Sequence, residues 1–463
     1  MIRTRIAPSP TGKDVHIGSV ATALMNYAWA KKNNGKFIVR IEDTDRTRLV
    51  EGGEAKMLAT LQELGIVADE SPLVGGPFAP YRQSERLPIY KKYALELVEK
   101  GKAYYCTCTP ERLNEMRTKQ QQEKKVPKYD RHCLTRQAEV KQEMEKGSKY
   151  VVRLLIPEEE IVFTDMIRGE VRFHSSSIDD QVLLKSDGFP TYHLGVVVDD
   201  HLMEITHVMR GEEWLPSTPK HLILYRAFGW KEPQFGHVSL LRNPDKSKLS
   251  KRKNPVWASD YIEKGIFKEA LLNYLSLMGW SHPEGKELFD LAEYIRVFDI
   301  KDIQTTAPVF DQVKLEWMNG EYIRNMDAHL LNTKIQEYIG DSYDSTIVSK
   351  SIPLVRERIK KLSDYVPLTE ALFKAPVSYE VDISGKKDIL LAVRKSLETL
   401  MEFKAAAIGD AMVVVAKESG LKNSEFFQLL RVAITGKKIS PPLNESMEII
   451  GKEGCLKRLQ AVI

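Results

Sequence analysis

The chain has 463 residues, a formal net charge of +4 and four cysteines. Its length is typical of roughly three domains, and its small charge means that a nucleic acid would have to bind through a basic face rather than through overall charge. No apolar run is long enough to cross a membrane, Met1 is followed by polar residues rather than a signal-peptide core, and the cysteines are too few for a disulfide framework. We expect a cytoplasmic protein with no membrane partner.

Residues 2–46 predict a strand, a helix and a second strand. A short strand at residues 2–7 is followed by a loop, because proline fixes φ and glycine permits positive φ at Pro8, Pro10 and Gly12. Apolar residues at 20, 24, 27 and 28 then recur at helical spacing. Residues 37–39 form an apolar run, which is typical of a strand covered on both faces.

His16 and Gly18 lie where this helix is expected to begin. The free N–H groups and the positive dipole end of a helix form an anion site. His16 can donate a hydrogen bond to a phosphate oxygen, and Gly18 has no Cβ, so a ligand can approach its backbone. The alternative is a structural loop with a surface histidine.

The remaining elements extend an α/β pattern and then change character. Residues 51–64 and 87–100 predict helices, which implies a parallel sheet. From residue 102 onward we expect an inserted α+β region, and from residue 182 a return to the parallel sheet. The sequence further predicts strands at 103–108, 150–156, 161–173, 204–209 and 238–241, helices from 109 and over 218–229, and helical segments over 255–325 and 326–463.

A cationic stretch at residues 242–253 follows the expected strand at 238–241. It carries six basic side chains and one acidic side chain, Asp245. A run of this kind is usually a solvated loop. A cationic loop at the end of a strand can also close on a phosphate chain and stabilise charge in a transition state.

These two stretches resemble the paired signatures of class I aminoacyl-tRNA synthetases, His16-Ile17-Gly18-Ser19 and Lys248-Leu249-Ser250-Lys251-Arg252. Ser19 departs from the first signature, in which a second histidine is usual. The flanking motifs narrow the resemblance to bacterial glutamyl-tRNA synthetases over residues 3 to about 325. They lie at residues 5–12, 40–46, 81–86, 187–193, 198–201 and 210–214.

The resemblance implies a Rossmann-like parallel catalytic sheet with an inserted acceptor-end-binding domain and an all-helical C-terminal region. The implied domains are 1–101 and 181–254 for the two catalytic halves, 102–180 for the insertion, 255–325 for a stem-contact domain and 326–463 for an anticodon-binding domain. The implied reaction is ATP-dependent activation of L-glutamate to glutamyl-adenylate, followed by transfer to the 3′ end of tRNA(Glu).

Two arginines and a glutamate at predicted strand ends suit an amino acid with two carboxylates. Arg5 and Arg210 can each bind a carboxylate bidentately, and Glu42 suits an ammonium group. The resemblance places Arg5, Ala7, Ser9, Glu42, Tyr192 and Arg210 around glutamate. It places Ser9, His16, Gly18, Glu213, Leu241, Lys248, Leu249, Ser250, Lys251 and Arg252 around ATP. We expect His16, Gly18, Lys248, Ser250, Lys251 and Arg252 to act in catalysis, with Lys251 on the α/β-phosphates.

We expect Mg²⁺ to arrive with ATP rather than at a dedicated site of Asp43, Asp45, Asp199 and Asp200. Cys106, Cys108 and Cys133 are weak zinc candidates, because some members of the family carry zinc here. The fourth ligand of that pattern is replaced by Thr135, and structural zinc is almost always four-coordinate. We therefore expect no zinc.

The expected partners are tRNA(Glu), L-glutamate and ATP, with the chain as a monomer and tRNA(Gln) left open as a second tRNA. No anticodon-reading residue can be picked out in 326–463. The alternatives are a glutaminyl-tRNA ligase, a truncated paralogue that modifies a tRNA base, a tRNA-binding regulator without catalysis, and a small-metabolite nucleotidylyltransferase. The paired arginines, the signatures and the helical tail favour the glutamate enzyme.

Overall fold

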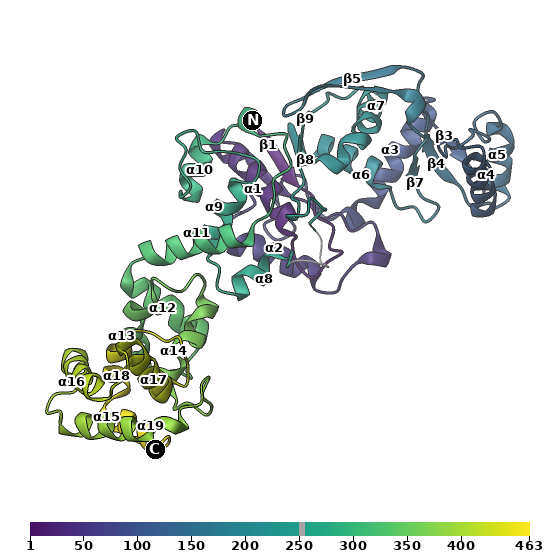
Figure 1. Ribbon diagram of the computed structural model, residues 1–463. Helices are drawn as coiled ribbons and strands as arrows, with labels where there is room; N and C mark the ends of the chain where they lie inside the picture. The colour runs from purple at the N-terminus through teal and green to yellow at the C-terminus, as the bar shows by residue number, and fades with distance from the viewer. Residues whose placement is uncertain (250–254) are drawn as a thin grey trace. The chain divides into compact units, whose positions relative to one another are not determined.

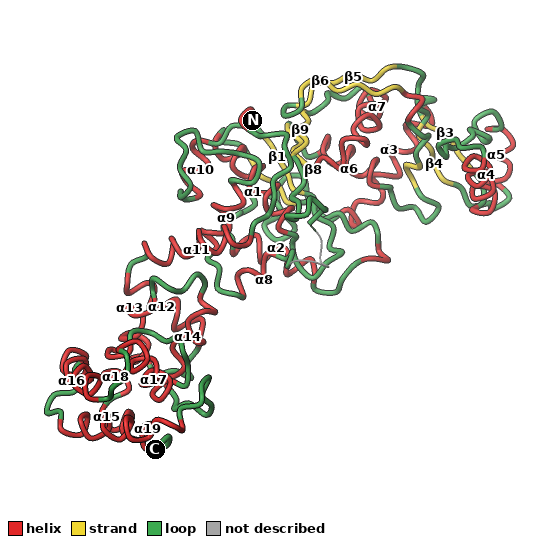
Figure 2. The backbone as a smooth tube through the Cα atoms, viewed as in Figure 1, coloured by secondary structure: helices red, strands yellow, loops and turns green. Residues whose placement is uncertain are grey.

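The computed structural model describes every residue except 250–254. The chain forms two compact units, Met1–Asp260 with Leu272–Asp311, and Tyr261–Leu271 with Gln312–Ile463 (Figure 1). All strands of the described residues belong to the first unit, and the second is helical (Figure 2). The expected α/β fold with a helical C-terminal region is confirmed, whereas the expected division into segments 1–101, 102–180, 181–254, 255–325 and 326–463 stays a prediction.

Four parallel strands form the centre of the first unit. β1 (Arg3–Ile6) pairs with β2 (Lys36–Val39), and β8 (His207–Gly211) pairs with β9 (Gln234–Val238). β1 and β8 lie side by side (Figure 1). Just before β8, the backbone N–H of Thr206 donates to the carbonyl oxygen of Arg3 in β1 at 2.9 Å. The carboxyl ends of these strands therefore meet at one edge, which is where ligands bind in open α/β sheets.

The outer strands differ from the sequence prediction. We expected residues 161–173 in the insertion and residues from 182 in the parallel sheet. Instead β5 (Glu160–Asp165) and β6 (Gly169–His174) form a hairpin that joins β9, and β7 (Val182–Leu184) joins the antiparallel sheet of β3 (Ala103–Cys106) and β4 (Val151–Leu154). Periodicity along the chain predicts a strand but not its partner, because pairing is set by hydrogen bonds between distant segments.

Helices cover both faces of the parallel strands. α1 (Ile17–Lys32) is tied to the sheet by Asn26, whose carbonyl oxygen accepts from the Thr4 hydroxyl at 2.8 Å and whose side-chain amide donates to the Met209 carbonyl at 3.1 Å. The other helices of the first 249 residues are α2 (Gly53–Glu63), α3 (Leu87–Glu99), α4 (Pro110–Gln122), α5 (Gln137–Glu145), α6 (Tyr192–Leu202) and α7 (Thr218–Phe228).

The second half of the chain is helical, as predicted. Apolar side chains such as Leu390, Met412 and Phe426 are fully buried between its helices. These helices are α8 (Ala258–Glu263), α9 (Lys268–Ser276), α10 (Leu291–Val297), α11 (Gln312–Asn325), α12 (Ala328–Ile339), α13 (Ser345–Val355), α14 (Tyr365–Phe373), α15 (Lys387–Thr399), α16 (Ala405–Glu418), α17 (Asn423–Thr435), α18 (Leu443–Ile450) and α19 (Lys452–Gln460).

Candidate active site

A cavity of about 370 Å³ lies at the carboxyl ends of β1, β8 and β9. Every residue that the sequence analysis assigned to the site, and that the structure describes, lines this one cavity. Those residues are Arg5, Ala7, Ser9, His16, Gly18, Glu42, Tyr192, Arg210, Glu213, Leu241, Lys248 and Leu249. Ser250, Lys251 and Arg252 lie outside the described residues.

His16 caps the helix that points into the cavity. It is the N-cap residue of α1, and its Nδ1 accepts a hydrogen bond from the backbone N–H of Gly18 at 3.0 Å. The neutral ring then carries its proton on Nε2, the nitrogen suited to donating to an anion. A Cβ on Gly18 would lie 3.2 Å from His16 Nδ1, so a side chain there would crowd the cap. His16 and Gly18 thus form the helix N-terminus that their spacing predicts.

A short hairpin brings Lys248 and Leu249 to the opposite wall. The strand expected at 238–241 is instead β9, which ends at Val238, so residues 239–241 lie beyond the strand. Beyond it, the backbone N–H of Leu249 donates to the Leu241 carbonyl at 3.2 Å, and Arg242 and Lys248 form an antiparallel bridge. The cationic stretch therefore begins as a turn folded back over the end of β9.

Glu213 lies at the same edge, in the space left free because Gly211 has no side chain. A Cβ on Gly211 would lie 2.0 Å from Glu213 Oε2, because the carboxylate folds back over the glycine. Trp214 also lines the cavity, and its ring lies 4.1 Å from that of Tyr192, centroid to centroid. An aromatic wall thus stands beside the arginines.

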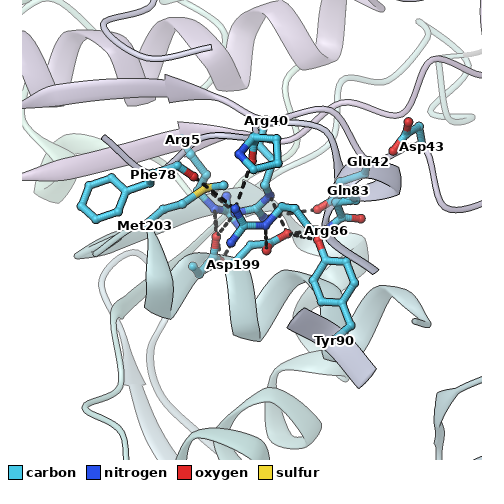
Figure 3. Close-up of polar contacts among 12 residues, drawn as sticks. Arg5, Arg40, Glu42, Asp43, Phe78, Gln83, Arg86, Tyr90, Asp199 and Met203 are labelled. Atoms are coloured by element: carbon cyan, nitrogen blue, oxygen red, sulfur yellow. Dashed lines mark hydrogen bonds and ion pairs between the residues drawn. The ribbon is translucent and has the colours of Figure 1, made fainter. Parts of the chain in front are cut away.

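A buried ion network links Arg5 to Glu42. Asp200 Oδ1 accepts from Arg5 Nε at 3.1 Å and from Arg40 Nη1 at 2.7 Å. Arg40 is fully buried, and its Nη2 donates to Glu42 Oε1 at 3.3 Å (Figure 3). Asp200 therefore fixes the guanidinium of Arg5, and Arg40 fixes the carboxylate of Glu42.

Asp199 holds the next layer of the same network. Its carboxylate accepts from Arg86 Nε at 2.7 Å, from the Tyr90 hydroxyl at 2.8 Å and from Gln83 Nε2 at 2.9 Å. Figure 3 shows these side chains converging from the segment around α3 on α6. Asp199 thus anchors the helix that carries Asp200.

Burial and charge act in opposite directions on the two carboxyls of this network. Burial raises the pKa of Glu42 to about 7, although Arg40 and Arg5 partly oppose the rise. Burial also disfavours the charged form of Asp200, but Arg5 and Arg40 outweigh it and hold the pKa of Asp200 below its usual value. The two carboxyls of one network thus differ: the arginines favour the ionised form of Asp200, whereas burial favours the neutral form of Glu42.

Arg210 has a different set of partners. Its Nε donates to His237 Nε2 at 3.1 Å, and its Nη1 donates to the Tyr192 hydroxyl at 3.2 Å and to His221 Nδ1 at 3.1 Å. Its Nη2 donates to Thr218 Oγ1 at 2.9 Å. The side chain is buried beside Tyr192, at the end of β8.

Two family descriptions match the sequence. The catalytic domain of tRNA synthetases class I (E and Q) matches residues 1–317, and an anticodon binding domain matches residues 316–463. The chain belongs to the class I tRNA synthetases of the E and Q type. This confirms the resemblance that the two signatures indicated.

Relatives of known name match this synthetase from end to end. The glutamate–tRNA ligases of Chloroherpeton thalassium and Cutibacterium acnes are 42% and 45% identical to it, over 100% and 99% of this chain and 97% of each relative. The crystal structure of a glutamate tRNA ligase from Elizabethkingia meningosepticum in complex with its amino acid superposes with a TM-score of 0.88 at 35% identity, over 100% of this chain and 99% of that one.

The acidic residues considered for a dedicated metal site of this synthetase all have protein partners. Asp199 and Asp200 bind arginines, as described above. Asp43 accepts from the backbone N–H of Ser84 at 2.8 Å, and Asp45 pairs with Arg48 at 2.6 Å. Their arrangement is explained by these contacts.

Among the described residues no helix has the length and apolar character to cross a membrane.

The cysteines of the insertion do come together. The sulfur atoms of Cys106, Cys108 and Cys133 lie within 4.8 Å of one another. The Tyr129 hydroxyl lies 3.4 Å from Cys106 Sγ and 3.3 Å from Cys108 Sγ. Tyr129 was not predicted as part of this cluster, because it lies four residues before Cys133 and outside the family's ligand pattern. The three sulfurs supply three of the four donors of a tetrahedral zinc site, and the Tyr129 hydroxyl beside them would have to supply the fourth.

Several residues around the cavity were not assigned a role from the sequence. Arg40 lies in the flanking motif at residues 40–46 but was given no role, and Asp200 was considered only as a metal ligand. His221 and His237 carried no signal, because a histidine inside a helix or a strand is not distinctive by itself. Their common feature is contact with Arg5, Glu42 or Arg210, which only the folded chain reveals.

Proposed function

We propose that this synthetase is a glutamate–tRNA ligase. In the first step the α-carboxylate of L-glutamate attacks the α-phosphate of ATP, which forms glutamyl-adenylate and releases pyrophosphate. In the second step the terminal ribose hydroxyl of tRNA(Glu) attacks the activated carbonyl and AMP leaves. Both steps depend on positioning and on charge stabilisation more than on an acid–base residue.

One observation carries this proposal: Arg5, Arg210 and Glu42 line the same cavity as the helix N-terminus at His16. Two guanidinium groups match the two carboxylates of glutamate, and Glu42 matches its ammonium group. Ala7, Ser9 and Tyr192 complete the wall around the amino acid. Glutamine carries one carboxylate fewer, so the paired arginines favour glutamate over glutamine.

The ATP phosphates would lie between α1 and the hairpin that carries Lys248. His16 and the backbone at Gly18 would hold phosphate oxygens, and Ser9, Glu213, Leu241 and Leu249 would line the nucleotide. Lys251 would neutralise charge on the α- and β-phosphates in the transition state, with Ser250 and Arg252 beside it in the second signature. Mg²⁺ would arrive with ATP and be held through its phosphates.

The tRNA would contact the insertion at residues 102–180, the segment 255–325 and the helical region 326–463. We propose a cytoplasmic monomer that charges tRNA(Glu), with tRNA(Gln) as a candidate second substrate. The basic side chains of this helical region include Arg356, Arg358 and Lys437, which are candidates for contacts with tRNA phosphates. In the structure Arg358 Nη1 donates to the Ser440 carbonyl at 2.7 Å and Lys437 Nζ to the Pro367 carbonyl at 2.8 Å, so both already hold the helical fold together.

ATP–pyrophosphate exchange tests the proposal directly. We expect exchange with glutamate when tRNA(Glu) is present and none with glutamine. Exchange with glutamine alone would move the assignment to the sister enzyme. Binding of tRNA without exchange under any condition would favour the regulator without catalysis, and tRNA-independent exchange with another acid would favour a metabolite nucleotidylyltransferase.

The role of Arg210 is tested in the same assay. Arg210→Ala should raise the KM for glutamate by roughly 100-fold, because a buried charge-assisted contact is lost. The KM for ATP should change by less than about threefold, since Arg210 lies on the amino-acid side of the cavity. Equal losses for both substrates would mean that Arg210 has only a structural role.

A further inference from the structure

Arg210 differs from the other buried arginines of the site in the charge of its partners. Arg5 pairs with Asp200, Arg40 with Asp200 and Glu42, and Arg86 with Asp199. Within the described residues no carboxylate forms an ion pair with Arg210. Its polar contacts are instead to neutral groups of Tyr192, Thr218, Trp214, His221 and His237.

These contacts use all of the N–H groups of the guanidinium. An arginine side chain has five N–H donors and no acceptor. Nε faces His237, the two hydrogens of Nη1 face Tyr192 and His221, and those of Nη2 face Thr218 and, at 3.4 Å, the carbonyl oxygen of Trp214. Five groups therefore hold the guanidinium before any ligand enters, and a carboxylate of the substrate would replace the longest of these contacts, the one to the Trp214 carbonyl.

The geometry also fixes the protons on both histidines. His237 Nε2 accepts from Arg210, so its proton is on Nδ1, which lies 2.6 Å from Asp165 Oδ2. His221 Nδ1 accepts from Arg210, so its proton is on Nε2, which lies 3.1 Å from His193 Nδ1. Each ring thus accepts a hydrogen bond from Arg210 with one nitrogen and donates from the other nitrogen, His237 to Asp165 and His221 to His193.

The surroundings keep these rings uncharged. Burial lowers the pKa of His221 well below its usual value, and the neighbouring Arg210 lowers it further. Burial is also the main cause that lowers the pKa of His237, although its hydrogen bond to Asp165 opposes the shift. Asp165 is held in turn by the backbone N–H groups of Ile167 and Arg168 at 2.9 and 3.0 Å.

We propose that His221 and His237 are positioning and specificity residues, which hold Arg210 by neutral acceptors so that its charge stays uncompensated for a carboxylate of the substrate. This inference rests on the proposed function. A carboxylate in place of either imidazole would hold the guanidinium equally well but would cancel its charge. The proposed selectivity for an anionic amino acid thus depends on the absence of a carboxylate in direct contact with Arg210.

Isosteric substitutions separate this role from simple support. His221→Gln and His221→Glu have nearly the same size, and both offer an oxygen to Arg210, but only glutamate adds a negative charge. We expect His221→Gln to raise the KM for glutamate by less than about 10-fold and His221→Glu by more than about 100-fold, the cost of removing a buried charge contact. The KM for ATP should change by less than about threefold in both variants.

Thr218 provides a second pair of matched variants, which tests the inference even if the His221 variants do not fold. Its hydroxyl accepts from Arg210 Nη2, so Thr218→Asp should weaken glutamate binding at least about 10-fold more than Thr218→Asn. Binding of glutamate would also be measured by calorimetry, with circular dichroism to verify folding. Equal effects within each pair, or no effect of the charged variants, would overturn the inference.

The outcomes distinguish this inference from the proposed function. A wild-type chain that shows no glutamate-dependent exchange would refute the function itself. A wild-type chain that is active, with matched variants that behave alike, would refute only the role of neutral support for Arg210.

Discussion

Glu42→Gln offers a test in which stability and function should move in opposite directions. Burial raises the pKa of Glu42 from 4.5 to about 7 in the folded chain. A carboxyl whose folded pKa is raised destabilises the fold as pH rises from the unfolded value through the folded one. At about 1.4 kcal/mol per pKa unit, ionised Glu42 costs about 3 kcal/mol above neutral pH.

The neutral glutamine cannot ionise and escapes this cost. Relative to the wild type, Glu42→Gln should gain about 1 kcal/mol in unfolding free energy at pH 5 and about 3 kcal/mol at pH 8. Denaturant unfolding at both pH values measures the change. The exposed variant Glu63→Gln is the control, because its side chain is solvated in both states. A difference that does not vary with pH, or a loss of stability at pH 8, would refute the assigned titration.

Whereas ionisation of Glu42 lowers stability, it should raise the kcat/KM for glutamate. Glu42 must be ionised to hold the ammonium group of the substrate, so wild-type kcat/KM for glutamate should fall about tenfold per pH unit below 7. Glu42→Gln should lose roughly 100-fold at pH 8 and lose this pH dependence. A variant with the wild-type pH profile would show that another group titrates.

Three further predictions concern the rest of the chain. Lys251→Ala should slow adenylate formation by roughly 10²–10³-fold with little change in glutamate binding, measured by exchange and calorimetry; unchanged turnover would refute its role. Asp199→Ala should lower the unfolding free energy by about 3–5 kcal/mol, because it leaves Arg86 buried without its partner; a loss below about 1 kcal/mol would contradict this. Elemental analysis should find one zinc per chain, lost in Cys108→Ser and weakened about tenfold in Tyr129→Phe; a metal-free wild type would support the expectation from sequence.

The sequence located the cavity because its lining residues belong to short local patterns. His16 and Gly18 are two residues apart at a helix start, Arg5 and Arg210 lie near the carboxyl ends of strands, and Glu42 lies just beyond one. In parallel strands such positions converge at one edge, so local spacing was sufficient to place them together. The same reasoning gave the helical C-terminal region, where apolar periodicity is strong.

The supporting residues could not be found in this way. His221 lies in the first turn of α7 and His237 lies beside Arg210 near the end of β9, but a single histidine at either place is not distinctive in the sequence. The sheet partners of β5, β6 and β7 were also not predictable in this way. A strand pairs through hydrogen bonds with segments that are distant in the sequence, and local periodicity does not reveal them. Tyr129 reaches two thiols only because the chain folds back between it and Cys106, which residue spacing does not encode.

The two arginines of the cavity illustrate why contacts beyond the lining determine selectivity. Arg5 forms an ion pair with Asp200, so part of its charge is already compensated by the protein. Arg210 is held as firmly but only by neutral groups, so an anionic ligand gains the Coulomb energy of an unshared buried charge. A neutral amide would leave that charge desolvated and unpaired, which is the more costly state. Under the proposed function, discrimination against glutamine therefore arises behind Arg210, in His221 and His237, as much as at the surface that the substrate touches.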